Sequence, residues 1–289
     1  MSDTAGAISR GAEKLPVVST FWHGGPLPLW SCQCLRSFVA AGHETRVYTF
    51  NDALDLPPDV IRCDASEIIP ESAVFYYKSG QWVGSVSGFS NLFRYKMLHD
   101  RGGYWVDADV FCRRPFPRYP RATVSREDAR KINNAVIFAP AGDRMMMEAY
   151  RTAQRMGDNV IWGQTGPVLT TKLATSGQYD VDILEPTSFY PVHWKNAVRK
   201  FLLPSCANQV EMACKDSFGV HLYNEIFRRF RISTDMLPPR DSFLDRLMGF
   251  GSDSSLNRMS AAEVRWKNAA YYVRRVPPKL AQLATAARP

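Results

Sequence analysis

The sequence predicts an α/β fold in which helices flank a mixed, mainly parallel central sheet. The opening segment gives the first reason: residues 17–24 have a strand pattern, residues 29–42 a helical pattern that ends at Gly42, and residues 44–50 a second strand pattern. Strand, helix and adjoining strand form a βαβ signature, which favours parallel pairing. The second reason is size, because 289 residues with 45% hydrophobic content can bury one large core.

The middle of the chain continues this alternation. A proline-rich loop and short helical patches are expected after residue 50, followed by a helix from about Ser87 to Asp100 whose apolar residues share one face. Gly102 and Gly103 end that helix. We expect the next strand at residues 104–111, YWVDADVF, because the run is apolar except for its two aspartates.

The remaining elements repeat the pattern to the end of the domain. Further strands are expected at 135–140, 180–186 and 219–224, and further helices at 143–156, 167–174 and 225–231. We therefore divide the chain into a disordered lead-in at 1–14, an α/β domain at 15–230 and a helical extension at 231–289.

Composition excludes several classes of protein. No apolar run reaches the roughly 18 residues that span a bilayer, and the first 20 residues lack the apolar core of a signal peptide, so a cytoplasmic location is expected. The six cysteines have neither zinc-ligand spacing nor the density of a disulfide scaffold, which favours reduced thiols. A metal or redox role for the pair Cys32 and Cys34 is the weaker alternative.

The net charge of +8 is concentrated near the C-terminus. From Arg258 onward seven basic residues face one acid, Glu263, and aromatic residues such as Trp266 are interspersed with them. This composition suits peripheral contact of residues 258–289 with an anionic membrane surface. A solvated basic helix that packs by its aromatic face is the alternative, and no recognised motif indicates nucleic-acid binding.

Two aspartates, Asp107 and Asp109, interrupt the apolar run at 104–111. In a strand both would point to the same side, and at about 6 Å and a dielectric constant near 20 their repulsion would cost roughly 3 kcal/mol. A bound Mn²⁺ or Mg²⁺ would turn this repulsion into a net attraction, because these cations bind carboxylate and phosphate oxygens. Solvation of the strand end, or pairing with a nearby base such as Arg113, is the alternative.

The helix before this motif adds context. Asn91 and Arg94 lie three residues apart on one helical face, and only the Gly102-Gly103 turn separates that helix from Trp105 and the DxD motif. This arrangement resembles the DxD glycosyltransferases of the Och1-like and capsular-polysaccharide type, similar to glycosyltransferase family 32, which share a GT-A fold with α-1,4-glycosyltransferases and clostridial glucosylating toxins. Later segments also match the family in order, at 21–28, 133–140, 161–173, 189–194 and 221–224.

The resemblance implies a set of metal-binding roles. Asp109 would be the main direct ligand of Mn²⁺ or Mg²⁺, and Asp107 would bind the metal through water or contact the ribose and sugar of the donor. His221 would complete the metal site as in some relatives. A histidine on a strand is more often a satisfied core residue, and that alternative stays open here.

The resemblance also implies donor contacts. Arg94 would reach the donor sugar or its phosphate, which suits the fixed fork of donors on a guanidinium. Trp22 would lie near the nucleotide base, Trp105 would pack beside base or ribose, and Gln164 would face the anomeric carbon. Asn91 departs from the family, which usually has Asp there; its amide accepts a hydroxyl hydrogen but adds no charge.

The function implied is metal-dependent transfer of a hexose or N-acetylhexosamine with retention at the anomeric carbon. The expected donor is a nucleotide sugar, with UDP favoured, and the expected acceptor is a saccharide or a lipid-linked or lipopolysaccharide glycan at the inner face of a bacterial membrane. One alternative is a catalytically degenerate relative that binds a membrane or partner. A DxD phosphatase-like hydrolase is disfavoured, because its motif normally ends the first strand, whereas about 90 residues of α/β pattern precede Asp107.

Overall fold

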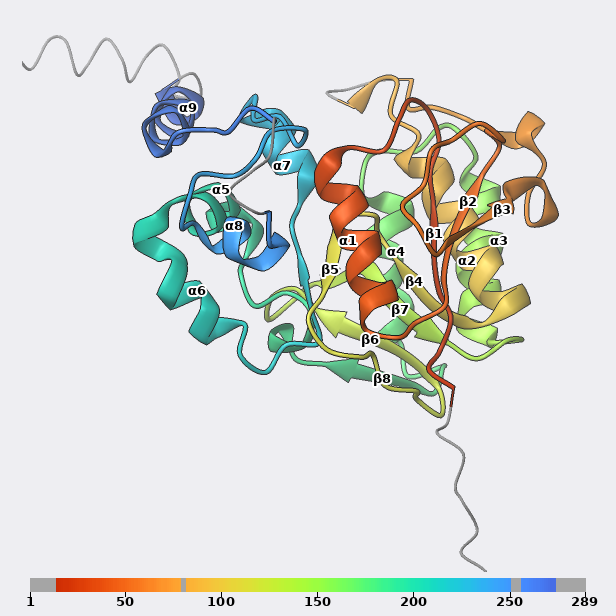
Figure 1. Cartoon of the computed structure of the whole chain (residues 1–289). Helices are drawn as coiled ribbons and strands as arrows, with labels where there is room; N and C mark the ends of the chain where they lie inside the picture. Colours follow the sequence, from red (N-terminus) through yellow and green to blue (C-terminus); the bar gives the residue numbers. More distant parts are fainter. Residues whose placement is uncertain (1–13, 79–81, 251–255, 274–289) are drawn as a thin grey trace, which may run out of the picture.

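A computed structural model describes residues 14–78, 82–250 and 256–273 (Figure 1). A large sheet has the strand order β3-β2-β1-β4-β7-β6-β8, and a small sheet pairs β5 with β9. The strands are β1 (Val18–Phe21), β2 (Thr45–Thr49), β3 (Val60–Asp64), β4 (Gly103–Val106), β5 (Val110–Cys112), β6 (Ala122–Arg126), β7 (Ile132–Ala139), β8 (Val181–Leu184) and β9 (Gly219–His221). The predicted fold class is confirmed, since only the two pairings of β7, with β4 and β6, are antiparallel in the large sheet.

Helices cover both faces of the large sheet (Figure 1). They are α1 (Leu29–Ala40), α2 (Ser87–Arg101), α3 (Arg144–Met156), α4 (Leu169–Ala174), α5 (Ala197–Leu202), α6 (Ala207–Ala213), α7 (Asn224–Arg229), α8 (Phe243–Met248) and α9 (Ala261–Val273). Strand β4 shows how the two faces are filled, because successive side chains point to opposite sides. Tyr104 packs in the core under α1, and Trp105 packs in the core under α2 and α3.

The opening βαβ unit and the long helix α2 form where the sequence predicts them. Two strands of the large sheet were not predicted, β3 and β6. Strand β3 lies at the sheet edge and is largely exposed, so it carries no apolar run. Strand β6 is buried, but its sequence ATVSR has the polar character of a loop, and only its position between β7 and β8 makes it a strand.

The single strand predicted at residues 104–111 is wrong. Strand β4 ends at Val106, and the chain turns through Asp107, Ala108 and Asp109 into β5, which belongs to the other sheet. The backbone N–H of Val110 donates to the carbonyl of Asp107 at 3.0 Å and closes this turn. Apolar residues continue through the run because β5 is buried against β9 and α1, so composition alone does not reveal the change of partner.

The C-terminal segment packs beside the sheet as a group of helices that includes α5, α6 and α8 (Figure 1). Helix α9 is anchored by Val264, which is buried, and by Tyr271, whose ring stacks on Phe230 with centroids 3.8 Å apart. Trp266 and Val273 on the same helix are exposed. The predicted lead-in lies outside the described residues except for Lys14, and residues 274–289 of the basic tail also lie outside them.

No helix within the described ranges combines the length and apolar character needed to cross a bilayer. The cysteines at all six positions are free thiols, and Cys34 is buried whereas Cys32 is half-buried.

Candidate active site

Asp107 directly follows the last residue of β4, and its carboxylate accepts two hydrogen bonds, one from a helix and one from the strand. Arg94 on α2 donates Nη2 to Oδ1 of Asp107 at 2.7 Å, and the indole Nε1 of Trp105 donates to the same oxygen at 2.8 Å. The guanidinium of Arg94 also lies 4.6 Å from the centroid of the Trp105 ring. Arg94 therefore places a positive charge against Oδ1 of Asp107 and fixes that carboxylate, while neither of these two contacts uses Oδ2.

Arg94 itself is fixed by the strand that runs beside it. The side chain is only 4% exposed, and its Nη1 donates to the carbonyl of Asn134 on β7 at 2.5 Å. Its Nε is buried and has no hydrogen-bond partner among the described residues. The guanidinium therefore reaches the site in one orientation with donor capacity left over.

Asp109 is held from the opposite side, by the C-terminal half of the chain. Its Oδ2 accepts the backbone N–H of Asn224 at 2.7 Å, and its Oδ1 lies 3.2 Å from Nε2 of His221. Burial alone would raise the pKa of the Asp109 carboxyl, but the charge and hydrogen bond of His221 and the N–H of Asn224 outweigh it and lower that pKa.

His221 reaches Asp109 because of the register of the small sheet, in which Val110 on β5 pairs with His221 on β9. Burial would lower the pKa of the His221 imidazole, but Asp109, followed by Asp107 and Glu127, raises it. Its Nδ1 is buried without a hydrogen-bond partner in the described part of the chain. His221 thus differs from a core histidine with two hydrogen bonds, since Nε2 faces the Asp109 carboxylate and Nδ1 has no partner among the described residues.

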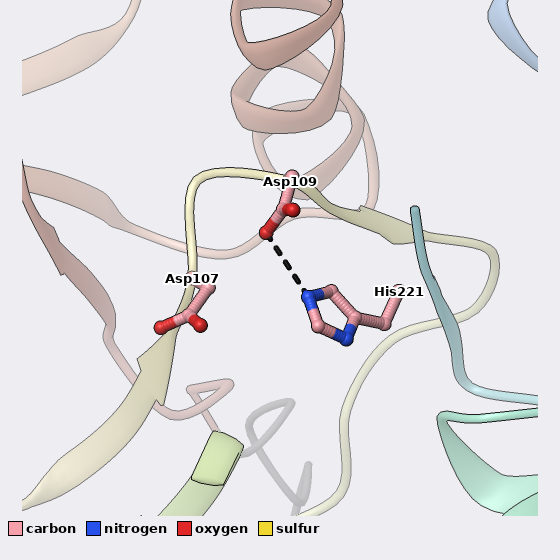
Figure 2. A group of neighbouring side chains, drawn as sticks. All are labelled: Asp107, Asp109 and His221. Atoms are coloured by element: carbon pink, nitrogen blue, oxygen red, sulfur yellow. Dashed lines mark ion pairs between the residues drawn. The ribbon is translucent and has the colours of Figure 1, made fainter. Parts of the chain in front are cut away.

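Together these three side chains form a group that fits a divalent cation. One ligand atom from each of Asp107, Asp109 and His221 lies within 4.8 Å of the others (Figure 2). Figure 2 shows both aspartates on one turn, with the His221 ring facing them across the gap. Two carboxylates and an imidazole suit Mn²⁺ and are acceptable to Mg²⁺, and the negative charge of the acid pair favours any such cation.

Asn91 lies one helical turn before Arg94, and both the oxygen and the nitrogen of its amide have a hydrogen-bond partner. Its Oδ1 accepts from Nδ2 of Asn134 at 2.9 Å, and its Nδ2 donates to Oγ1 of Thr165 at 3.3 Å. A Cβ atom at Gly166 would approach Nδ2 of Asn91 to 3.0 Å, so Gly166 gives the amide its space. The network accommodates asparagine, and one lone pair of Oδ1 and one hydrogen of Nδ2 remain for a ligand.

Two cavities meet at the DxD turn. The base-side cavity, of about 490 Å³, is lined by Trp22, Ser31, Ala108 and Asp109, with further residues from α7 and the segment after it. The sugar-side cavity, of about 360 Å³, is lined by the three residues of the metal group and by Asn91, Arg94, Glu127, Lys131, Asn133, Trp82, Trp162 and Arg229, among others. Asp109 borders both cavities, so a ligand that fills both would pass the metal group.

Two residues predicted for the site line neither of these cavities. Trp105 is 1% exposed, donates a hydrogen bond to Asp107 and lies under the guanidinium of Arg94, so it supports these residues without facing a cavity. Gln164 is exposed, and its Oε1 accepts the backbone N–H of Ile161 at 3.1 Å. The sequence did not predict Glu127 or the tryptophans that line the sugar-side cavity. Among these residues only Trp162, a large aromatic residue in a loop, could have indicated a binding role.

Two family models match separate parts of the chain. Residues 141–237 match "Alpha 1,4-glycosyltransferase conserved region", and residues 68–131 match "Capsular polysaccharide synthesis protein". The second match contains the DxD turn, and the first contains His221. These matches confirm the predicted resemblance and identify the chain as a glycosyltransferase. Among curated proteins, none matches this sequence.

Comparison with solved structures gives distant likenesses. The PaToxG glycosyltransferase aligns at a TM-score of 0.43 and 12% identity, over 89% of this chain and 86% of that one. The apo-form glycosyltransferase GlyE of Streptococcus pneumoniae TIGR4 aligns at 0.42 and 8%, over 91% of this chain, which spans only 64% of GlyE. The galactosyltransferase LgtC, solved with donor and acceptor sugar analogues, aligns at 0.37 and 11%, over 91% and 98%.

Proposed function

We propose that this glycosyltransferase is metal-dependent and moves a hexose or N-acetylhexosamine from a nucleotide sugar, with UDP as the favoured carrier, to a glycan or lipid-linked glycan, with retention at the anomeric carbon. One observation carries the proposal: Asp107, Asp109 and His221 converge where two cavities meet, with Arg94 beside them. A nucleotide sugar has the matching layout, since its diphosphate lies between its base and its sugar.

Asp107, Asp109 and His221 would hold the ion, Mn²⁺ or Mg²⁺. Such an ion, when bound, neutralises the charge that grows on the departing diphosphate. Arg94 adds a second positive charge beside the diphosphate, and its contact with Oδ1 of Asp107 fixes that carboxylate.

The base-side cavity suits the nucleoside. Its volume of about 490 Å³ lies in the range of sites for small molecules. Trp22 offers a half-buried ring for the base, and its Nε1 is fixed by the carbonyl of Gly25 at 2.8 Å. The donor sugar would then enter the sugar-side cavity beside Asn91 and Arg94, whose remaining donors and acceptors match its hydroxyls.

Helix α9 supports the proposal of a peripheral membrane contact through residues 258–289. Trp266, Tyr272 and Val273 are exposed on this helix although they are apolar or aromatic. Arg265 and Lys267 flank Trp266 and would favour anionic headgroups. An acceptor that is linked to a lipid would be presented at such a surface.

A catalytically degenerate relative remains the second candidate, and Asn91 is the observation in its favour. The surroundings of Asn91 weaken that argument, because Asn134 and Thr165 hydrogen-bond to the oxygen and the nitrogen of its amide. A degenerate site would have no reason to keep two carboxylates and an imidazole within 4.8 Å.

Thermal unfolding with and without ligands tests the proposed function. We expect UDP-sugars in the presence of Mn²⁺ to raise Tm by several degrees, because ligand at 100 times its Kd adds about 2.7 kcal/mol to the unfolding free energy. The shift should disappear with EDTA and in Asp109→Asn. If no nucleotide sugar raised Tm in the presence of Mn²⁺ or Mg²⁺, the proposed function would be wrong.

A further inference from the structure

The outer wall of the sugar-side cavity is aromatic. Trp82 and Trp162, from two loops far apart in the sequence, stack with ring centroids 4.5 Å apart and planes 12° from parallel. Arg229 at the end of α7 lies 4.3 Å from the Trp82 ring and 5.9 Å from the Trp162 ring. We call Trp82, Trp162 and Arg229 the aromatic wall. It lines the same cavity as the metal group.

The aromatic wall is held in place from behind. Trp82 is 8% exposed and packs with Tyr77 and Val160 in a small apolar cluster of its own. Backbone hydrogen bonds join Tyr77 to Ser85, from N–H to carbonyl at 3.0 Å, and fix the base of the loop. Trp162 lies against this support and is 42% exposed, so part of its ring is free to meet a ligand.

The floor of the same cavity carries a buried acid that the proposed metal group does not include. The side chain of Glu127 is 2% exposed, and its Oε2 lies 2.8 Å from Nζ of Lys131. Its Oε1 accepts from Nδ2 of Asn133 at 3.2 Å. Each carboxylate oxygen has lone pairs beyond these contacts, and a buried acceptor with spare capacity in a cavity can bind a hydroxyl group strongly.

An aromatic face and a carboxylate acceptor in one cavity fit the chemistry of a sugar ring. The C–H groups on one side of a pyranose are weakly positive and apolar, which suits the negative face of an indole. Its hydroxyls need acceptors such as Glu127. An anionic ligand fits less well, because Glu127 is negative and the nearby cations are engaged, Lys131 with Glu127 and Arg229 with Glu225 and the tryptophan rings.

We propose that the aromatic wall and Glu127 form the acceptor subsite and that it takes a neutral saccharide unit. The inference rests on the proposed function, in which the donor sugar occupies the part of the cavity beside Arg94. The acceptor sugar stacks on Trp162 and donates hydroxyl hydrogens to Glu127, so that it shares one cavity with the donor sugar and the metal group.

Truncation of Trp162 tests the stacking contact. Lactose, cellobiose and maltose serve as acceptor probes, and UDP release from UDP-glucose, UDP-galactose and UDP-N-acetylglucosamine is measured with Mn²⁺. For a saccharide that accelerates release by the wild type, Trp162→Ala should raise its KM about tenfold, the cost of one lost aromatic contact. The acceptor KM of Trp162→Phe should lie between those of the wild type and Trp162→Ala. The Kd for UDP, measured by calorimetry, should stay within about twofold of the wild-type value in both variants.

Ile161→Ala is the matched control, because Ile161 is the sequence neighbour of Trp162, is 76% exposed and does not line the cavity. Glu127→Gln, which keeps the size of the side chain, should raise the acceptor KM as well, and circular dichroism confirms that each variant is folded. Equal acceptor KM values for Trp162→Ala and Ile161→Ala would overturn the proposal. So would a wild type that binds UDP and hydrolyses a UDP-sugar but responds to none of the saccharides, whereas a wild type that binds no UDP would refute the proposed function instead.

Discussion

Two buried histidines, His43 and His221, have opposite surroundings: His43 lies in the core with both nitrogens hydrogen-bonded, and His221 lies beside the two aspartates of the proposed metal group. His43, just before β2, is 3% exposed; its Nδ1 donates to the carbonyl of Pro16 at 2.8 Å, and its Nε2 accepts the N–H of Phe116 at 2.8 Å. His221 is 8% exposed, but its Nε2 faces the Asp109 carboxylate and its Nδ1 has no partner among the described residues.

The surroundings move the two imidazoles in opposite directions. Burial lowers the pKa of His43, and the carbonyl of Pro16 only partly offsets it, so the ring is neutral and both nitrogens are used. The carboxylates around His221 overcome the effect of burial and raise its pKa. Burial alone therefore does not decide the direction in which the pKa of a histidine moves, which depends on the charges beside the ring.

The largest effect is expected from the acid that His221 faces. Asp109→Asn keeps the shape of the side chain and the acceptor for the Asn224 N–H, but removes the charge that attracts the cation. Glycosyl transfer should fall by roughly 10² to 10³-fold, measured as UDP release at saturating donor. The matched control is Asp143→Asn, at the N-terminus of α3 and outside both cavities of the site, which should leave transfer unchanged.

A smaller and recoverable effect is expected at His221. His221→Gln removes the imidazole ligand while both carboxylates remain, so the Mn²⁺ concentration for half-maximal activity should rise roughly tenfold or more. Excess Mn²⁺ should restore most of the activity. An activity loss that Mn²⁺ does not relieve would mean that His221 is structural, like His43.

The smallest effect is expected at His43 and concerns stability. Its pKa is lowered from 6.5 in the folded protein, so below that pH the unfolded chain binds a proton more readily than the folded chain. The contribution of His43 is present above about pH 6.5 and is lost as the pH falls through its folded pKa. His43→Gln keeps one donor and one acceptor but cannot titrate.

Urea unfolding of wild type and His43→Gln at several pH values measures this contribution. The gap in unfolding free energy between the two should narrow as the pH falls from about 7.5 to about 5.5, because only the wild type loses stability through this group. A gap that stays constant or widens would show that His43 is not held neutral.

Much of the site could be read from the sequence because its parts are local. Asn91, Arg94, Trp105 and the two aspartates lie on consecutive elements, so spacing alone places them together, and helix α2 and its glycine turn formed as expected. Trp105 shows the limit of this reasoning. The spacing fixes its place in β4, but only the structure shows that it faces the core and donates to Asp107.

The remainder depended on contacts between distant segments. The stacking of Trp82 on Trp162 requires two distant loops to come into contact, and the sequence of neither loop predicts that contact. The turn at Asp107 to Asp109 forms because β5 pairs with β9 instead of continuing in the large sheet. Strand β9 lies more than 100 residues later in the sequence. The local sequence pattern indicates whether a segment forms a strand, a helix or a loop, whereas the segment that it packs against depends on the whole fold.

The small sheet of β5 and β9 has a consequence for biosynthesis. Asp109 meets the N–H of Asn224 across 115 residues of sequence. At roughly 5 to 20 residues per second, a ribosome needs roughly 6 to 23 seconds to add that stretch. All seven strands described for the large sheet precede His221 in the sequence. A nascent chain therefore carries Asp107 and Asp109 without His221 for that interval, and the proposed metal group is completed only after the strands of the large sheet have been synthesised.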